Sequence, residues 1–153
     1  RRRVNIESLT VSETERKGVS RYTITIKHDK REEVEKLVRQ IRKVVEVLAV
    51  FGYLDEEIVY NEIALFKIAT PAGGKPIDIE TINKVYKAWV VYWGLDYVVI
   101  EKAGSENEIL DFFRYIKSYG ILEFVKSGRV AVGKAANGLV EFLPEEAHWE
   151  YYV

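Results

Sequence analysis

The chain of 153 residues carries 23 Lys and Arg against 24 Asp and Glu, so its formal net charge is −1. This balance excludes the whole-chain positive field that draws proteins to nucleic acid or to anionic membranes. The chain has no Cys, which excludes disulfides and thiolate metal sites, and no apolar run approaches the ~20 residues that cross a bilayer. We therefore expect a cytoplasmic globular protein with no nucleic-acid partner and no membrane partner.

Two short strands are expected near the start of the chain. Residues 6–11 alternate between apolar and polar side chains, which is the pattern of a half-buried strand. Residues 21–27 alternate again and are rich in β-branched side chains, and the polar residues 12–18 between the two segments suit a hairpin loop. Together these segments predict an antiparallel hairpin.

A helix and a third strand are expected next. Asp29 lies three residues before Glu32, as in a capping box, and apolar side chains then recur at helical spacing up to Val45. Residues 47–51 form a short apolar run that we interpret as a strand. The first part of the chain thus predicts the order strand, strand, helix, strand.

The pattern begins again after an acidic segment at residues 54–61, which we interpret as a linker. Residues 62–70 indicate a strand, and residues 71–76 indicate a loop by their Gly and Pro content. Apolar residues from Ile79 to Trp89 then follow helical spacing, so an amphipathic helix is expected there.

A hairpin and a second helix follow in this part of the chain. Residues 90–93 and 97–100 flank a short turn that contains Gly, which predicts a pair of antiparallel strands. Ser105 with Glu108 three residues later predicts the start of a helix, and Gly120 is placed to end it.

Two further apolar runs, residues 121–125 and 130–132, complete the order β-α-β-β-α-β, which is the split βαβ or ferredoxin-like unit. The first part of the chain matches the last four elements of the same unit, so its first strand and most of its first helix would lie before Arg1. We expect an α+β fold with two ferredoxin-like domains. The expected division is a partial first domain (ββαβ) at residues 1–53, the linker 54–61, a second domain at 62–134 and a C-terminal extension at 135–153.

No residue pattern predicts catalysis or a metal site. The two His residues are far apart in the sequence, and no nucleophile, paired carboxylates or nucleotide-binding loop accompanies them. Asn5 stands out because it directly precedes the first strand and its side-chain amide is both donor and acceptor. It would either cap backbone groups or hold the ammonium or carboxylate of a small amino acid, and both interpretations stay open.

Residues 1–11, Arg-Arg-Arg-Val-Asn-Ile-Glu-Ser-Leu-Thr-Val, are similar to the segment RRGFNIESLTV of one family of metabolic regulators. Three further segments, at residues 14–24, 61–68 and 119–132, resemble the same family in the same order. The family is that of the regulatory (small) subunits of acetohydroxyacid synthase, also called acetolactate synthase. The resemblance covers nearly all of the chain up to Lys134.

This resemblance implies an N-terminal ACT domain and a non-catalytic subunit that activates the catalytic subunit of the synthase. Thiamine diphosphate, Mg and FAD would lie on that catalytic subunit, and none of them on this chain. A branched-chain amino acid, typically valine, would bind where ACT domains meet in a homodimer or higher oligomer, and would convey feedback inhibition. The resemblance places Asn5 and Ile6 in this effector site. The alternative is a stand-alone ACT-type amino-acid sensor that acts on another partner.

Overall fold

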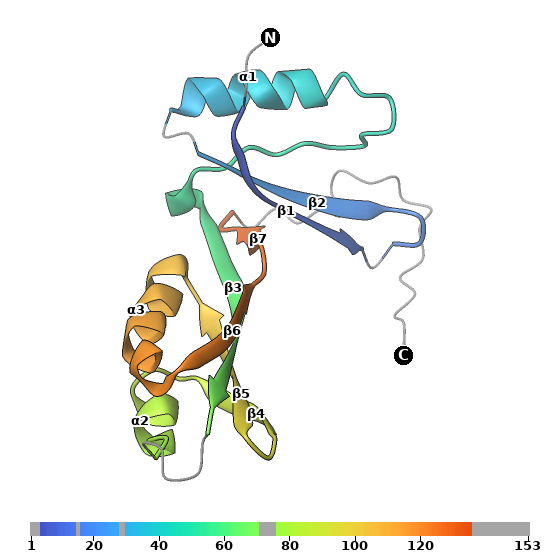
Figure 1. The fold of residues 1–153 in the computed structure, drawn as a ribbon. Helices are drawn as coiled ribbons and strands as arrows, with labels where there is room; N and C mark the ends of the chain where they lie inside the picture. The colour runs from blue at the N-terminus through green and yellow to red at the C-terminus, as the bar shows by residue number, and fades with distance from the viewer. Residues whose placement is uncertain (1–3, 15, 28–29, 71–75, 136–153) are drawn as a thin grey trace. The chain divides into compact units, whose positions relative to one another are not determined.

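The computed structural model describes residues 4–14, 16–27, 30–70 and 76–135. The chain divides into two compact units, an N-terminal unit of residues 1–59 with 131–153, and a C-terminal unit of residues 60–130 (Figure 1). None of the helices in the described part of the chain is long and apolar enough to span a membrane.

The N-terminal unit begins with the expected hairpin. Strand β1 (Ile6–Glu13) pairs antiparallel with strand β2 (Ser20–Ile26), with Leu9 opposite Ile24, which confirms the two predicted strands. The Thr14 hydroxyl donates to the Val19 carbonyl at 2.9 Å and closes the loop between them. Helix α1 (Arg31–Ile41) follows, as the apolar spacing predicted.

A β-bulge gives this hairpin one apolar face. The pairs Ile6–Ile26 and Ser8–Thr25 leave Glu7 as an extra residue, so Ile6 shares a face with Leu9 although the two lie three positions apart. The opposite face carries Ser and Thr side chains. We call the first face the hairpin apolar face; it consists of Ile6, Leu9, Val11, Tyr22, Ile24 and Ile26.

The strand expected at residues 47–51 does not form, so that prediction is wrong. In a split βαβ sheet the last strand pairs with the first, as β6 pairs with β3 in the C-terminal unit. Among the described residues no such first strand precedes β1, so residues 47–51 have no described strand to pair with. The expected cap Asp29 lies outside the described residues, and α1 ends before the apolar Val45.

The C-terminal unit has the complete predicted topology. Its elements are β3 (Ile58–Ala69), α2 (Ile79–Lys84), β4 (Trp89–Trp93), β5 (Tyr97–Gly104), α3 (Glu106–Ile116) and β6 (Ile121–Lys126). The strands lie in the order β4-β5-β3-β6 with every neighbouring pair antiparallel, which is the ferredoxin-like arrangement. A short strand β7 (Val130–Gly133) also pairs with β3.

Two boundaries differ from the sequence-based expectation. Strand β3 already begins at Ile58, and a 3₁₀ turn η1 (Asp55–Glu57) precedes it, so the segment interpreted as a linker is largely structured. Helix α2 ends at Lys84 instead of continuing to Trp89, because Lys87 takes a left-handed conformation with φ 49° that stops the helix. Trp89 therefore becomes the first residue of β4.

Helices α2 and α3 cover one face of this sheet (Figure 1), and the core lies between the two helices and the sheet. The Phe66 ring of β3 meets the Phe112 ring of α3 edge-on at 5.0 Å between centroids. The apolar core residues that are buried are Ala64, Phe66, Ile68, Ile82, Ala88, Val98, Ile100, Ile109, Phe112 and Ile116. A second 3₁₀ turn, η2 (Lys117–Tyr119), ends at Gly120 with φ 87°, which confirms the expected glycine stop.

Candidate functional site

The predicted effector residues Asn5 and Ile6 lie at the open end of the hairpin. The Asn5 backbone carbonyl accepts a hydrogen bond from the Lys27 backbone N–H at 3.4 Å, and Ile6 pairs with Ile26. Both predicted side chains are exposed, Ile6 to 55%. The backbone thus fixes this end of β1, while the Asn5 amide and the Ile6 side chain face outward.

Lys27 is a neighbour that the sequence did not assign to this site. It lies opposite Asn5 across the strand pair, is exposed, and brings a positive charge to the same end of the hairpin. An amide and an ammonium group can together bind a carboxylate, and Ile6, the next residue along the chain, adds apolar surface at the same end of the hairpin. The hairpin register is the signal that brings these residues together, because Lys27 is 22 positions from Asn5 in the sequence.

A shallow groove of about 350 Å³ lies between α1 and the segment that follows it. Val34 and Val38 of α1 form its floor with Phe51 and Tyr53, and Arg42 donates to the Val50 carbonyl at 3.4 Å. Gly52 permits this close packing, because a Cβ atom there would meet methyl groups of both Val34 and Val38 at 2.7 and 2.8 Å. Residues 50–53, although not a strand, therefore pack against the helix.

Glu57 joins η1 to the rest of the N-terminal unit. Its carboxylate forms an ion pair with Arg31 at the start of α1 and accepts from the Leu54 backbone N–H at 2.7 Å. The hydrogen bond from Leu54 and then that from Arg31 lower the pKa of Glu57. The Glu57 carbonyl also accepts from the Lys134 backbone N–H at 2.8 Å, which holds the end of β7 to this unit.

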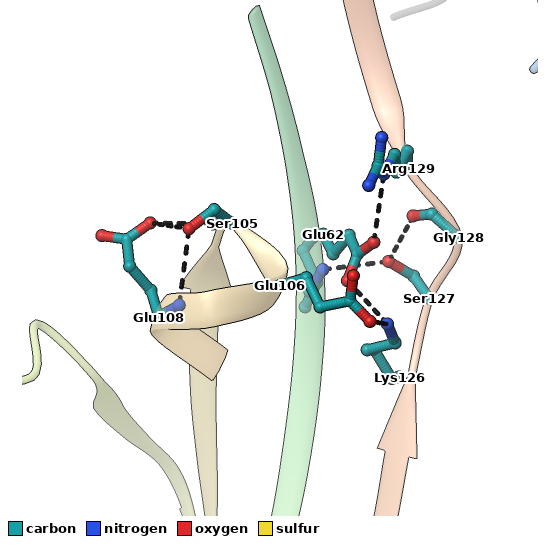
Figure 2. A network of polar contacts seen from close by, with 9 residues as sticks. Glu62, Ser105, Glu106, Glu108, Lys126, Ser127, Gly128 and Arg129 are labelled. Carbon is teal, nitrogen blue, oxygen red and sulfur yellow. Dashed lines mark hydrogen bonds and ion pairs between the residues drawn. The ribbon is translucent and has the colours of Figure 1, made fainter. Parts of the chain in front are cut away.

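A charged cluster lies at one end of the C-terminal sheet, with Glu62 at its centre (Figure 2). The Glu62 side chain is only 5% exposed and contacts Lys126 Nζ at 2.8 Å and Arg129 Nε at 3.6 Å. Glu106 lies 3.7 Å from the same Lys126 ammonium, and the Arg129 guanidinium stacks over the Tyr60 ring at 4.2 Å. The buried carboxylate is thus compensated by two cations.

Backbone contacts show what this cluster does. The Ser127 N–H donates to the Ile63 carbonyl at 2.8 Å, and the Ile63 N–H donates to the Ser127 hydroxyl at 2.9 Å. The hydrogen bond to Glu62 raises the pKa of Lys126, although its partial burial acts in the opposite direction. The cluster therefore holds the end of β6 against β3. Its central carboxylate is paired with two cations, so the role that the contacts support is a structural one.

The first turn of α3 is capped as predicted (Figure 2). The Ser105 backbone N–H and hydroxyl both donate to the Glu108 carboxylate at 2.8 Å, and the Glu108 N–H donates to the Ser105 hydroxyl at 3.4 Å. The hydrogen bond from the Ser105 N–H is the largest influence that lowers the pKa of Glu108. A negative charge at this helix start also interacts favourably with the helix dipole.

The described part of the chain holds no candidate metal site. Within those residues no three His, Cys, Asp or Glu side chains lie close enough to hold a metal ion. The two histidines, His28 and His148, lie outside the described residues, as do residues 71–75 of the expected loop and most of the C-terminal extension.

The fold places the chain among α+β proteins built from split βαβ units, with one complete unit and one that contributes a hairpin and a helix. Comparison with known proteins gives a narrower result. Residues 61–135 match the family model described as "Small subunit of acetolactate synthase", and residues 1–49 match "AHAS small subunit-like ACT domain". The chain belongs to the family of acetolactate synthase small subunits.

Individual relatives agree with this family. The acetolactate synthase small subunit of Bacillus subtilis is 34% identical over 134 residues, which cover 88% of this chain and 77% of the relative. A probable acetolactate synthase small subunit of Archaeoglobus fulgidus is 34% identical over 132 residues, or 86% and 81% of the two chains. The crystal structure of the Thermotoga maritima small subunit superposes with a TM-score of 0.75 at 26% identity, covering 88% of this chain and 83% of that one.

Sequence reasoning did not identify the buried Glu62 cluster. The signal was present, because Glu62 occupies the same alternating face of β3 as Ala64, Phe66 and Ile68, all of which are buried. A charged residue at a core position of a strand needs a partner of opposite charge. Lys126 is that partner, and only the pairing of β6 with β3 shows that it lies close by.

Proposed function

We propose that this chain is the regulatory subunit of acetohydroxyacid synthase, that it activates the catalytic subunit, and that it makes the enzyme sensitive to a branched-chain amino acid, valine. The observation that carries the proposal is that both parts of the chain, residues 1–49 and residues 61–135, match models of this one family. Thiamine diphosphate, Mg and FAD belong to the catalytic subunit in this proposal, and the present chain contributes binding and control.

The effector site of this proposal is the open end of the hairpin. The exposed Asn5 amide and the Lys27 ammonium are suited to the carboxylate of a free amino acid, and Ile6 provides apolar surface for a branched side chain. An effector bound by two or three exposed side chains is held weakly, so a second ACT domain is proposed to close the site. Valine would then lie between two copies of the chain.

The hairpin apolar face supports the need for a partner. Leu9, Val11 and Tyr22 on this face are 56%, 52% and 63% exposed, and contiguous apolar surface of this kind marks interaction sites. A partner that covers the face at one end and the effector at the other would couple the two events. Couplings between such sites are typically ~1–3 kcal/mol, and they act in both directions.

Activation is tested by adding the chain to the acetohydroxyacid synthase catalytic subunit of the same organism and measuring acetolactate formation with and without valine. We expect the chain to raise the rate and valine to reverse that rise. A chain that binds valine but leaves the catalytic subunit unaffected would be a stand-alone amino-acid sensor, and the proposal would be rejected.

The effector site is tested by isothermal titration calorimetry of valine into the Asn5→Ala variant. Loss of the amide is expected to weaken valine binding by at least about tenfold, because a hydrogen bond to a charged group contributes ~1.5–3 kcal/mol. Asn61→Ala is the matched control, since Asn61 is also exposed but lies in β3 of the other unit. Equal affinity of both variants would remove Asn5 from the site and leave the activation test unaffected.

A further inference from the structure

Strand β4 forms one edge of the C-terminal sheet. It is the first strand in the order β4-β5-β3-β6, and among the described residues β5 is its only strand neighbour. One row of its backbone N–H and C=O groups is therefore available to another strand. This edge belongs to the C-terminal unit and has no role in the effector site proposed above.

The composition of β4 is unusual for a free edge. Its five residues, Trp-Val-Val-Tyr-Trp, include no charged residue and no proline, the devices by which soluble proteins normally prevent edge pairing. Trp89, Val91, Tyr92 and Trp93 are 56%, 52%, 54% and 62% exposed. A strand with this β propensity and this exposure is suited to continue a sheet.

A β-bulge puts two of the aromatic side chains on the same face. Trp89 is opposite Glu101 and Tyr92 is opposite Val99, with the register shifted between Val90 and Tyr92. Glu101 and Val99 lie on one face of β5, so Trp89 and Tyr92 lie on that face too. In a regular strand, two residues three positions apart would lie on opposite faces. Tyr92 also stacks on Tyr97 of β5 with 5.8 Å between ring centroids.

We propose that β4 pairs antiparallel with β4 of a second copy of this chain, so that the two C-terminal sheets become one continuous sheet. A two-fold axis between Val90 and Val91 sets Trp89 of each copy opposite Tyr92 of the other, which makes two aromatic cross-strand pairs on one face. The strand is thus complementary to itself. Because it is uncharged, self-pairing brings no like charges together, whereas a foreign strand would need its own matching aromatic pair.

The absence of Cys from the chain permits a direct test with single cysteines. In the proposed register the two Val91 residues lie about 6 Å apart, from ~4.8 Å between strands and ~3.3 Å along them. This is within the ~4.4–6.8 Å between Cα atoms that a disulfide spans. Val91→Cys in the full chain is therefore expected to form a disulfide-linked dimer under mild oxidation.

Leu95→Cys is the matched control, because Leu95 lies in the turn after β4 and is 98% exposed. Random collision would cross-link this more accessible residue faster, whereas strand pairing favours Val91→Cys by at least about tenfold through its effective concentration. Equal rates for the two variants, or a faster rate for Leu95→Cys, would overturn the proposal. A dimer held only through the N-terminal unit would cross-link faster at Leu95→Cys, so the experiment distinguishes that interface from pairing of β4.

Amide hydrogen exchange of the unmodified chain provides a second measurement. Self-pairing predicts that the amides of residues 89–93 become more protected as protein concentration rises, while those of α3 do not change. Protection of β4 that is independent of concentration, or that requires another protein, would contradict pairing with a second copy.

Discussion

The two units of this protein are built from similar sequence patterns but differ in how completely they bury them. The C-terminal unit buries ten apolar residues, most of them where its sheet meets its two helices. In the N-terminal unit, by contrast, no described residue is buried, and the side chains of its hairpin apolar face are largely exposed. The difference shows that amphipathic strands and helices bury their apolar side chains only when the layer of secondary structure that they pack against is complete.

The helices make the same point. Helix α3 buries Ile109, Phe112 and Ile116 against a sheet that carries matching apolar residues. Helix α1 has apolar residues at the same spacing, yet Val34, Leu37 and Val38 are only half-buried, partly against residues 50–53. The apolar spacing is thus similar in the two helices, but α3 is the more apolar of the two and has the β4-β5-β3-β6 sheet to pack against. Four substitutions test this contrast.

The largest effect is expected for Phe66→Ala in the core of the C-terminal unit. The Phe66 ring contacts Phe112 and Phe124 with centroids at 5.0 and 4.9 Å, and its removal leaves a cavity. We expect a loss of about 3–5 kcal/mol in the free energy of unfolding, measured by urea titration. Hydrogen exchange should localise the loss to α3 and β5, and equal loosening of α1 would show that the units do not unfold separately.

Glu62→Ala is expected to have the next largest effect. It leaves Lys126 and Arg129 without the buried carboxylate between them, which costs about 3 kcal/mol when one partner of a buried ion pair is removed. Glu106→Ala, in the same network but 52% exposed, should change stability by less than about 1 kcal/mol. Comparable losses for the two variants, again by urea titration, would mean that burial does not set the strength of this cluster.

A smaller, pH-dependent effect is expected for Glu108→Gln. Because its folded pKa is below the ordinary 4.5, the Glu108 charge stabilises the unit fully above that value, and this contribution is lost as the pH falls through the folded pKa. Gln retains the capping geometry without the charge, so we expect a loss of ~0.3–1 kcal/mol at neutral pH. Unfolding of both proteins near pH 3 should give a smaller difference, and a constant difference would exclude the charge as its cause.

The smallest effect on stability is expected for Leu9→Lys on the hairpin apolar face. Leu9 is already 56% exposed, so the unfolding free energy of the chain should change by less than about 0.5 kcal/mol. Association with the catalytic subunit or with a second copy, measured by analytical ultracentrifugation, should nevertheless weaken. Leu122→Lys in β6, where Leu122 is 59% exposed, is the control and should leave association through the N-terminal unit unchanged.

Most of the fold was predictable from local signals. The alternation at residues 6–11, the helical spacing of α3 and the Ser105–Glu108 capping box are short-range patterns, and each is confirmed by the structure. The failures were of another kind. The apolar run at residues 47–51 has strand character but no described strand beside it, and the helix expected up to Trp89 ends at Lys84, shortly before Lys87 adopts a left-handed backbone.

The residues of the two proposed sites also divide into those that the sequence indicated and those that only strand pairing brings together. Asn5 could be selected from the sequence by its place directly before a strand, and the family resemblance added Ile6; their effector role stays a prediction. Lys27 enters only through the hairpin register, and the same is true of Trp89 and Tyr92, whose shared face depends on a bulge in the pairing of β4 with β5. Neighbours across strands are not neighbours in sequence.

The amino-acid sequence by itself determined most of the segments that form strands and helices, where α3 starts, and the order β-α-β-β-α-β of the C-terminal unit, because backbone preference and side-chain periodicity act over a few residues. The tertiary structure alone decided which of these amphipathic faces became buried. Burial requires a second surface at the right distance, and that surface comes from residues far away in the chain. Glu62 is buried because β6 brings Lys126 beside it, and Leu9 stays exposed because no described segment covers its face.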